Sequence, residues 1–248
     1  YVIIASGDGI YKLDYNQILD FHVEKEADLT LVVKTLPDHV DVRRYGNVKT
    51  DEDGRMIGFV EKPENPEGQK VFTGIYLIRR ELLLELLDSA EERGGYSLIS
   101  DLIMKYMESR KIYCYEMQGY WNNIGAVQNY YDANMWFLKP DVRQYFFEEY
   151  PDVKSRVSDR PPAKYNWGAE VKNSLVGSGS ILNGKVENSV LFKDVFVGKD
   201  TVIKNSIILN MVTIEDGAHI ENCIIESRST IKAGESYVGD GEILIVRK

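Results

Sequence analysis

Three short segments carry side chains suited to phosphate and metal chemistry, and each follows a stretch typical of a β-strand. Asp8 stands in a Ser-Gly-Asp-Gly turn directly after the apolar run 1–5, and Glu61 and Lys62 follow a second strand. A Trp-Asn-Asn-Ile-Gly segment at 121–125 lies between a third strand and a helix. In open α/β sheets ligands bind beyond the carboxyl ends of strands, so we expect these segments to face a ligand.

The carboxylate of Asp8 is of the type that holds Mg²⁺ against a phosphate, because hard cations prefer oxygen ligands. Lys62 suits neutralisation of a phosphate, and Glu61 suits hydrogen bonds from sugar hydroxyls. Pro63 is expected to force Lys62 into an extended conformation and to direct its side chain away from the sheet. On spacing alone, a capped turn and a solvated surface pair explain these residues better.

The other polar residues add little chemistry. Asn122 and Asn123 suit a turn and a helix cap, and neither carries the negative charge of a strong Mg²⁺ ligand. The three histidines, His22, His39 and His219, stand isolated from any cysteine or serine motif. They are expected at the protein surface.

The segment that would position these residues alternates strands and helices. This alternation predicts a mostly parallel sheet with covered faces and one inserted hairpin. Strands are expected at 1–5, 29–34, 47–49, 56–60, 74–78 and 112–117, with a hairpin turn at 51–54. Helices are expected after the capping residue Asp14 and at 81–91, 98–110 and 126–138.

The rest of the chain changes character twice. From 139 to 164 the periodicity fails and prolines interrupt the chain, which predicts a linker. After that, aliphatic residues recur at steps of about five to six residues, or multiples of them, with glycines near the corners. Such turns bury an apolar face only by stacking, so we predict a solenoid. An antiparallel sandwich is the rival, but it favours turn signals at about 8–12 residues. The aliphatic positions are Leu175, Ile181, Val186, Val197, Val202, Ile208, Ile214, Ile220 and Ile231.

The totals restrict the class of protein. The formal net charge of -9 argues against nucleic acid or an anionic membrane surface as the main partner. No apolar run is long enough to span a bilayer, and no signal-peptide pattern opens the sequence. The cysteines Cys114 and Cys223 match no metal spacing and are expected as buried thiols of a cytoplasmic protein. Because a buried strand is expected at Tyr1, we expect the chain to be a fragment.

Taken together, these motifs resemble the glucose-1-phosphate adenylyltransferase (ADP-glucose pyrophosphorylase) family. The run Ser-Gly-Asp-Gly-Ile-Tyr-Lys-Leu-Asp-Tyr at 6–15 is similar to the family's Ser-Gly-Asp-His-Ile-Tyr-Lys-Met-Asp-Tyr. Arg-Tyr-Gly at 44–46 resembles Arg-Phe-Gly, and Phe-Val-Glu-Lys-Pro at 59–63 resembles Phe-x-Glu-Lys-Pro. Thr-Gly-Ile-Tyr at 73–76 resembles Met-Gly-Ile-Tyr, and 120–126 resembles Tyr-Trp-x-Asp-Val-Gly-Thr.

The resemblance implies a fold and a set of site residues. It implies the C-terminal part of a Rossmann-like, GT-A-like nucleotidyltransferase domain at 1–138, a linker at 139–164 and a left-handed parallel β-helix of hexapeptide repeats at 165–248. It implies that Asp8 binds Mg²⁺ and that Gly46, Glu61, Lys62 and Gly74 bind glucose 1-phosphate. The reaction of the family is attack of the sugar phosphate on the α-phosphorus of ATP, and the family's glycine-rich ATP loop is missing from this sequence.

Four departures from the family pattern surround the same site. Asn123 replaces a metal-binding aspartate, Phe72 replaces a small residue at the sugar pocket, and Gly9 replaces a histidine. The family's Asp-Phe-Gly-Lys-Asp is reduced to Leu-Ile-Ser-Asp at 98–101, which removes a cation. This pattern resembles the GlgD-type subunit of bacterial glycogen synthesis, a regulatory paralogue that pairs with a catalytic subunit. The resemblance therefore implies a weakly catalytic or non-catalytic chain, with a catalytic subunit or a second copy as partner through the β-helix.

Two other functions stay open at this point. A catalytically competent adenylyltransferase would have to tolerate Asn123. A hexapeptide-repeat acyltransferase, or a plain assembly module, would place the chemistry or the contacts in the solenoid. An acyltransferase of that kind needs a histidine there, and His219 is the only candidate.

Overall fold

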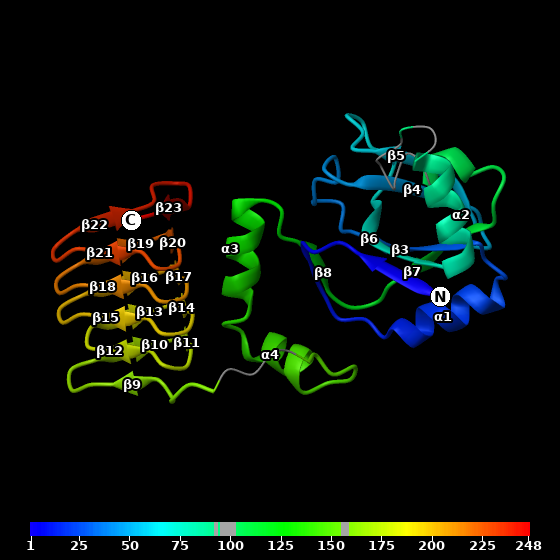
Figure 1. Cartoon of the computed structure of the whole chain (residues 1–248). Coiled ribbons are helices and arrows are strands. Elements are labelled where there is room, and N and C mark those ends of the chain that lie inside the picture. The colour runs from blue at the N-terminus through cyan, green and yellow to red at the C-terminus, as the bar shows by residue number, and fades with distance from the viewer. Residues whose placement is uncertain (92–93, 95–102, 155–158) are drawn as a thin grey trace. The chain divides into compact units, whose positions relative to one another are not determined.

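The computed structural model describes residues 1–91, 94, 103–154 and 159–248 (Figure 1). The chain divides into two units, Tyr1–Asn122 and Asn123–Lys248. The first unit holds the mixed sheet and the second holds two short helices and the solenoid.

The strand β6 (Lys70–Ile78) runs through the centre of the sheet of the first unit. Its whole length pairs with β3 (Leu29–Thr35) on one side. On the other side its first half meets β4 (Gly46–Thr50) and its second half meets β1 (Val2–Ala5). The outer strands are β5 (Met56–Glu61), which pairs with β4, and β7 (Ile112–Glu116), which pairs with β3.

The prediction of a mostly parallel sheet is wrong. Only the β3–β7 pair is parallel among the named strand pairs of this sheet, whereas β6 runs antiparallel to β1, β3 and β4. A parallel pair needs a crossover connection, usually a helix, but an antiparallel pair does not. The chain between β3 and β6 forms the predicted hairpin of β4 and β5, so β6 returns alongside β3 in the opposite direction.

A β-bulge interrupts the pairing of β6 with β3. Val32 pairs with Ile75 and Val33 pairs with Phe72, so Thr73 and Gly74 have no directly opposite residue. Gly74 has φ +81°, a conformation that suits glycine, and the Thr73 hydroxyl donates to the Val32 carbonyl at 2.8 Å. The bulge therefore fixes the backbone at a predicted sugar-binding glycine.

Helices and alternating strand residues make two apolar cores. Leu31 of β3 packs with the face of α2 (Arg80–Glu91), whereas Val32 packs with Ile18 of α1 (Tyr15–Glu24). The predicted cap is confirmed, because Asp14 accepts a hydrogen bond from the Asn16 amide at 2.9 Å. The helix predicted at 98–110 begins outside the described residues.

The expectation that His22 is a surface residue is wrong. Its side chain is 1% exposed, and Nδ1 lies 2.8 Å from the Thr30 hydroxyl. Val23, an apolar residue of the same helix, is 54% exposed. Burial lowers the pKa of His22, with the Arg79 charge acting in the same direction, so the ring is held in its neutral form.

The second unit starts with two helices, α3 (Val127–Trp136) and α4 (Pro140–Phe147). The segment from 139 was predicted to lack periodic structure, and α4 shows that this was wrong for its first part. Pro140 occupies the first turn, where a missing amide hydrogen is tolerated, and Val142 and Phe146 lie on one buried face. The Phe146 ring is 6.2 Å from Trp136 and 5.0 Å from Phe137, so aromatic contacts hold α4 to the end of α3.

The remaining chain confirms the predicted solenoid as a parallel β-helix (Figure 1). It contains three five-stranded parallel sheets, with strand orders β10-β13-β16-β19-β22, β11-β14-β17-β20-β23 and β21-β18-β15-β12-β9. The strand bounds are β9 Lys164–Tyr165, β10 Glu170–Lys172, β11 Leu175–Val176, β12 Ile181–Leu182, β13 Lys185–Glu187, β14 Val190–Leu191, β15 Phe196–Val197, β16 Val202–Lys204, β17 Ile207–Ile208, β18 Thr213–Ile214, β19 His219–Glu221, β20 Cys223–Ile225, β21 Thr230–Ile231, β22 Ser236–Val238 and β23 Leu244–Val246.

Stacked side chains hold the turns in register. One corner carries Asn173, Asn188 and Asn205, which have φ of +42°, +48° and +45°. The amide of Asn173 donates to Asn188 at 2.9 Å, and that of Asn188 donates to Asn205 at 2.6 Å. Asparagine tolerates this left-handed backbone, and its side-chain amide hydrogen-bonds to the asparagine of the neighbouring turn. These two properties explain its use at the corner.

The corner between β12 and β13 is shorter than the corresponding corner of the other turns. Only Asn183 and Gly184 separate these strands, whereas four residues separate β15 from β16 in the next turn. A Cβ on Gly184 would lie 2.6 Å from the Thr201 carbonyl oxygen, so the short corner requires glycine. The strands on either side still pair in parallel register with the next turn.

The helix α3 runs alongside the sheet that contains β14, β17 and β20 (Figure 1). The Tyr131 hydroxyl donates to the Asn205 carbonyl at 2.7 Å. Val190, Ile207 and Ile224 form one column of this sheet, next to the inward column of Leu191, Ile208 and Ile225, yet all three are buried. The helix therefore covers part of a flat apolar sheet.

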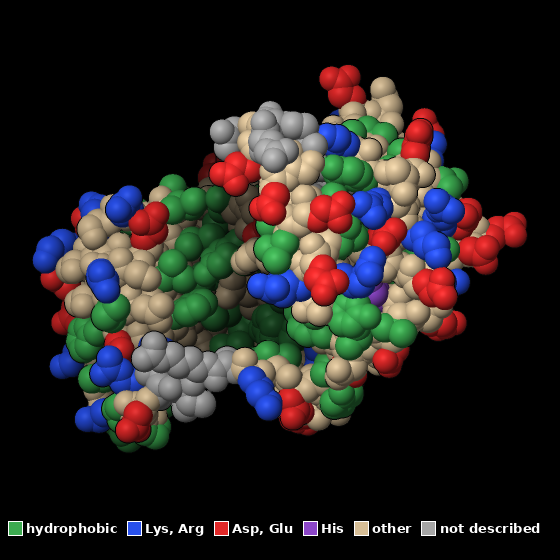
Figure 2. Space-filling view, turned by 45° about the vertical axis from the view of Figure 1, so that its right-hand side comes forward, with side chains coloured by type: hydrophobic (Ala, Val, Ile, Leu, Met, Phe, Trp, Pro, Cys, Tyr) green, Lys and Arg blue, Asp and Glu red, His purple; other side chains and the backbone are tan. Residues whose placement is uncertain are grey.

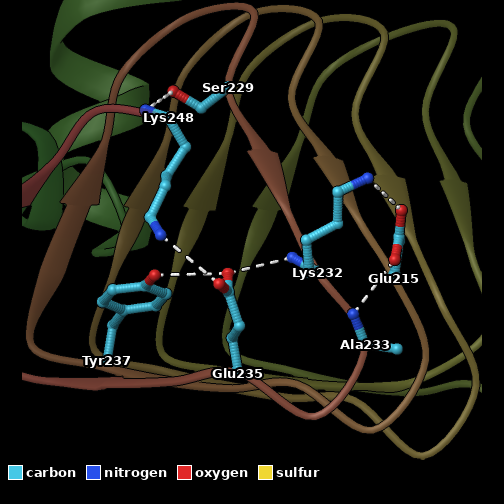
Figure 3. Close-up of polar contacts among 7 residues, drawn as sticks. All are labelled: Glu215, Ser229, Lys232, Ala233, Glu235, Tyr237 and Lys248. Atoms are coloured by element: carbon cyan, nitrogen blue, oxygen red, sulfur yellow. Dashed lines mark hydrogen bonds and ion pairs between the residues drawn. The ribbon is translucent and has the colours of Figure 1, made fainter.

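The final turn is held by a polar network (Figure 3). The Glu235 carboxylate accepts from the Lys232 amide at 3.0 Å, from the Tyr237 hydroxyl at 3.2 Å and from Lys248 Nζ at 3.3 Å. The Lys232 side chain donates to Glu215 of the preceding turn at 2.9 Å. Side chains of two turns thus fix the end of the chain to the solenoid.

Candidate functional site

Gly46 and Glu61 face each other across the β4–β5 ladder. A Cβ on Gly46 would lie 3.0 Å from Glu61 Oε2 and 2.5 Å from Phe59 Cζ. Gly46 is therefore required for space, because it lets the Glu61 carboxylate and the Phe59 ring approach the backbone. The predicted sugar-binding carboxylate therefore lies directly against the backbone of Gly46.

Lys62 does not adopt the extended conformation that Pro63 was expected to impose. Its φ is +48°, in the left-handed region, and its backbone amide donates to the Tyr45 carbonyl at 3.1 Å. This hydrogen bond joins the two ends of the hairpin. It outweighs the preference of a residue before proline for an extended backbone. Lys62 Nζ lies 3.9 Å from Glu61 Oε1, so the two predicted ligands remain neighbours.

Lys62 shares an open hollow of about 580 Å³ with two arginines. The hollow is lined by Asp41, Arg43, Arg44, Lys62, Pro63 and Glu64. Arg43 forms an ion pair with Asp41, to which it donates through Nε at 2.9 Å and Nη2 at 2.7 Å. This ion pair holds the pKa of the Asp41 carboxyl at about 2. Arg44 forms no ion pair within the described part of the chain, and Lys62 has only the 3.9 Å contact with Glu61, so the hollow offers positive charge to an anion chiefly through Arg44.

Sequence reasoning did not assign Arg44 to the site. The only feature of the sequence that pointed to Arg44 was its place in the Arg-Tyr-Gly motif at 44–46, two residues before Gly46. The hollow brings Arg44 to Lys62 because the Lys62 amide is bonded to Tyr45, the residue after Arg44. A contact between two loops of this kind is not visible in residue spacing.

Gly74 lies against the turn that carries Asp8. The Ser6 amide donates to the Gly74 carbonyl at 2.9 Å, and a Cβ on Gly74 would be 2.7 Å from Ser6 Cβ. The Ser6 hydroxyl in turn donates to Asp8 Oδ1. Gly74 and Asp8, which were assigned to different ligands, are therefore linked through Ser6.

The residues predicted to hold Mg²⁺ fit the ion poorly. Asp8 supplies one carboxylate, and one of its oxygens already accepts from Ser6. The Asn123 side-chain oxygen accepts from the Gly125 amide at 2.8 Å and carries no net charge. Mg²⁺ sites in proteins rely on carboxylates and phosphates, so the substitution at Asn123 weakens the donor set. No cluster of three or more His, Cys, Asp or Glu residues suited to a metal occurs among the described residues.

Two aromatic side chains, Tyr45 and Trp121, contact each other near the turn that contains Asp8. Trp121, in the short strand β8 (Trp121–Asn123) that pairs with β2 (Gly9–Tyr11), has an edge contact with Tyr45 at 5.4 Å between ring centroids. Its indole Nε1 is buried and has no hydrogen-bond partner within the described part of the chain. A Cβ on Gly9 would lie 3.7 Å from that nitrogen, an ordinary contact, but only 3.2 Å from the Tyr11 ring, which would have to shift to admit a larger residue.

Two other departures have different outcomes. Phe72 was expected to crowd the sugar pocket, but its ring is 6% exposed and packs between Phe59 and Tyr76 in the core under α2. It therefore presents little surface to a ligand. The predicted loss of a cation at 98–101 lies outside the described residues.

The alternative reactions find less support in the geometry. His219 lies on the outer side of the solenoid, where Nε2 is 3.4 Å from Glu221 Oε2 of the same strand. His39 is exposed, as expected.

The thiols of Cys114 and Cys223 are buried, and burial raises the pKa of Cys114 to about 12. Within the described residues, no helix is long and apolar enough to cross a membrane.

Comparison with known proteins places this geometry in a family. The family profile described as "Nucleotidyl transferase" matches residues 1–139, and the profile "GlmU-like, C-terminal hexapeptide" matches residues 161–242. Among curated proteins, the glucose-1-phosphate adenylyltransferase of Clostridium perfringens (strain 13 / Type A) is 36% identical over 218 residues, which is 87% of this chain and 55% of that protein.

Two further relatives carry the same name. That of Acetivibrio thermocellus is 34% identical over 246 residues, covering 98% of this chain and 57% of the relative. That of Bacillus subtilis (strain 168) is 36% identical over 206 residues, covering 82% of this chain and 54% of the relative. The chain thus spans little more than half the length of these relatives. With a nucleotidyl transferase match over more than half of its residues, the chain belongs to the nucleotidyl transferase family, among the homologues of glucose-1-phosphate adenylyltransferases.

Proposed function

We propose that this chain belongs to a GlgD-type regulatory subunit of glucose-1-phosphate adenylyltransferase, which binds glucose 1-phosphate but catalyses weakly or not at all. In this proposal, glucose 1-phosphate lies against Gly46 and Gly74, with Glu61 on its hydroxyls and Lys62 on its phosphate. The close approach of Glu61 to Gly46 supports retention of the sugar site. The names of the relatives support the substrate.

The proposed regulatory role rests on the neutral side chain of Asn123 at a position where the family has a metal-binding aspartate. Its side-chain oxygen accepts from the Gly125 amide, and it offers no negative charge to a metal. Transfer of a nucleotidyl group depends on metal and cationic groups that neutralise phosphate charge in the transition state. A neutral group at a metal position lowers the reaction rate while leaving sugar contacts in place. The expected partner is therefore a catalytic subunit that supplies a complete metal site.

The first test separates binding from catalysis. We expect calorimetric titration of glucose 1-phosphate onto the chain to show binding, with glucose much weaker. We also expect an assay with ATP, glucose 1-phosphate and Mg²⁺ to give little ADP-glucose from a protein that carries both this chain and the ATP loop, when it is tested without a partner. Mixing with a catalytic subunit from the same source should raise the rate above that of the catalytic subunit alone. Full activity without a partner would contradict the regulatory role.

A second variant examines the metal position. Asn123→Asp retains an oxygen that can accept from the Gly125 amide, so the turn should keep its conformation. If the missing charge limits the reaction, this variant should gain Mg²⁺-dependent activity in a protein that also carries the ATP loop. If the chain is a competent enzyme that tolerates Asn123, the change should alter its Mg²⁺ dependence little.

A further inference from the structure

The turn that carries the two arginines of the hollow is closed by one side chain. The Tyr45 amide donates to the Val42 carbonyl at 3.1 Å, so Arg43 and Arg44 are the central residues of a β-turn. Asn47 Nδ2 donates to the Val42 carbonyl at 3.2 Å and to the Tyr45 carbonyl at 3.3 Å. A single amide group thus holds both end residues of the turn.

The Tyr45 carbonyl joins this turn to Lys62. It accepts from Asn47 Nδ2 and also from the Lys62 amide at 3.1 Å. Lys62 has φ +48°, and such a backbone persists in a residue other than glycine only where surrounding contacts hold it. Because both hydrogen bonds end on the same oxygen, the amide that holds the turn also holds the backbone of Lys62.

The environment of Asn47 explains why an asparagine stands there. Its backbone lies in the sheet opposite Val60 of β5 and opposite Val71 of β6. Its side-chain oxygen is buried and has no hydrogen-bond partner within the described residues. An unpaired buried oxygen destabilises a fold, so an apolar residue would suit this position better unless the amide donors are needed. The two carbonyl oxygens can only accept, so they need these donors.

The cations of the hollow act against the charge of the whole chain. The formal net charge is -9, and acidic and basic side chains are mixed over the surface visible in Figure 2. An overall field of this sign does not draw a phosphate to the protein. Because the attraction between two charges falls with distance, binding of the phosphate depends on where the Arg44 and Lys62 side chains are placed.

We propose that Asn47 is a positioning residue for the phosphate of glucose 1-phosphate. Its amide closes the turn that carries Arg44 and, through the Tyr45 carbonyl, fixes the backbone of Lys62, so that both cations line one hollow. Asn47 does not itself line the hollow and acts only through these residues. The role of Asn47 rests on the proposed function, because the anion is the phosphate of that ligand.

The test is a double-mutant cycle on the 248-residue chain, measured by calorimetric titration of glucose 1-phosphate. Asn47→Leu removes the amide donors at similar volume and should weaken binding about fivefold, while the affinity for glucose stays unchanged. In a chain that already carries Arg44→Gln, the same substitution should cost less than about twofold, because only Lys62 is left to misplace. Equal costs in the two backgrounds would show general damage to the fold and would overturn the proposal.

Two further variants control for misfolding, which circular dichroism detects. Asn47→Ala removes the same donors without adding bulk, and it decides the cycle if Asn47→Leu does not fold. Asn65→Leu is the matched control, since it changes an exposed asparagine in the loop after Lys62, and it should alter the affinity less than about twofold. A loss with Asn65→Leu as large as with Asn47→Leu, or failure of both Asn47 variants to fold, would assign Asn47 to the fold alone.

Hydrogen exchange separates this role from the proposed function. In Asn47→Leu the peptides that contain the Tyr45 and Lys62 amides should exchange faster than in the wild type, whereas Asn65→Leu should leave them unchanged. If the wild-type chain binds no glucose 1-phosphate, the proposed function fails, and the exchange rates alone decide whether Asn47 holds these segments. If the wild type binds the ligand but Asn47→Leu leaves both exchange rates unchanged, the proposed function stands and Asn47 has no positioning role.

Discussion

The carboxylate of Glu61 lies over Gly46, its partner in the antiparallel ladder of β4 and β5, at a distance that a side chain on Gly46 would not allow. The Phe59 ring would come still closer to a Cβ at this position, with Cζ at 2.5 Å. The absence of a side chain at Gly46 thus leaves space for both the Glu61 carboxylate, a predicted ligand-binding group, and the Phe59 ring of the core. The geometry explains why these residues occur together in the two motifs.

Gly46→Ala should damage both the hairpin and the sugar site. The new Cβ would lie 2.5 Å from Phe59 Cζ, so the ring or strand has to move, at a cost of about 1–3 kcal/mol in unfolding free energy. Gly58→Ala is the matched control in the same hairpin, since its Cβ would meet only the Lys49 side chain, with the nearest atom at 3.4 Å. Urea unfolding and titration with glucose 1-phosphate measure the two effects. Equal losses for both variants would contradict the role of the close approach.

Arg44→Gln should weaken binding of glucose 1-phosphate on the order of tenfold, because it removes a cation that shares the hollow with Lys62. Arg43→Gln is the control, since Arg43 is already paired with Asp41 in the same hollow. Glucose, which has no phosphate, should bind equally to both variants. If Arg43→Gln lowers the affinity for glucose 1-phosphate as much as Arg44→Gln, the hollow acts only through its total charge.

Asn188→Ala should destabilise the solenoid by about 2 kcal/mol. The change removes the amide bonds to Asn173 and Asn205 and leaves an alanine at φ +48°. Asn188→Gly removes the same bonds but suits the backbone, so it should cost only about 1 kcal/mol. Urea unfolding followed by circular dichroism gives both values. The two variants should not be equally stable if the left-handed corner matters.

The last turn should lose stability in acid through Glu235. Its hydrogen bond from the Lys232 amide, more than its other contacts, holds the pKa of Glu235 below the ordinary value of 4.5. A group with a lowered pKa stabilises the fold above that value and loses the effect as the pH falls through its folded pKa. Unfolding midpoints of the wild type and Glu235→Gln should therefore differ at pH 6 and converge below pH 4. A constant difference across this range would exclude a contribution from the charge.

Patterns that depend on neighbours along the chain were predictable. Asp14 was expected to cap α1, and the turn at 51–54 was expected to join β4 to β5. The solenoid was also foreseen, but its phase was harder to assign. Ile181 and Val202 were counted among the repeating aliphatic residues, yet their neighbours Leu182 and Ile203 fill the core. Where two aliphatic residues are adjacent, spacing alone does not show which one points inward.

Features that depend on distant contacts were missed. The bulge at Gly74 arises from the pairing of β6 with β3, and the left-handed Lys62 arises from its bond to Tyr45. His22 is buried, and its ring is hydrogen-bonded to the Thr30 hydroxyl of β3. The assignment of Gly46, Glu61, Lys62, Gly74 and Asp8 to ligands came from family motifs and stays a prediction. None of their contacts could be calculated from residue order.

The short corner at Gly184 also affects how this protein can change over evolution. This corner has two fewer residues than the corresponding corner of the next turn, yet the strands of all three sheets stay in parallel register with that turn. Corners of the solenoid therefore tolerate changes in chain length that the strands would not. A loop inserted at such a corner would add new surface to the subunit without disturbing the stacked core. The solenoid is thus open to new binding segments, one corner at a time.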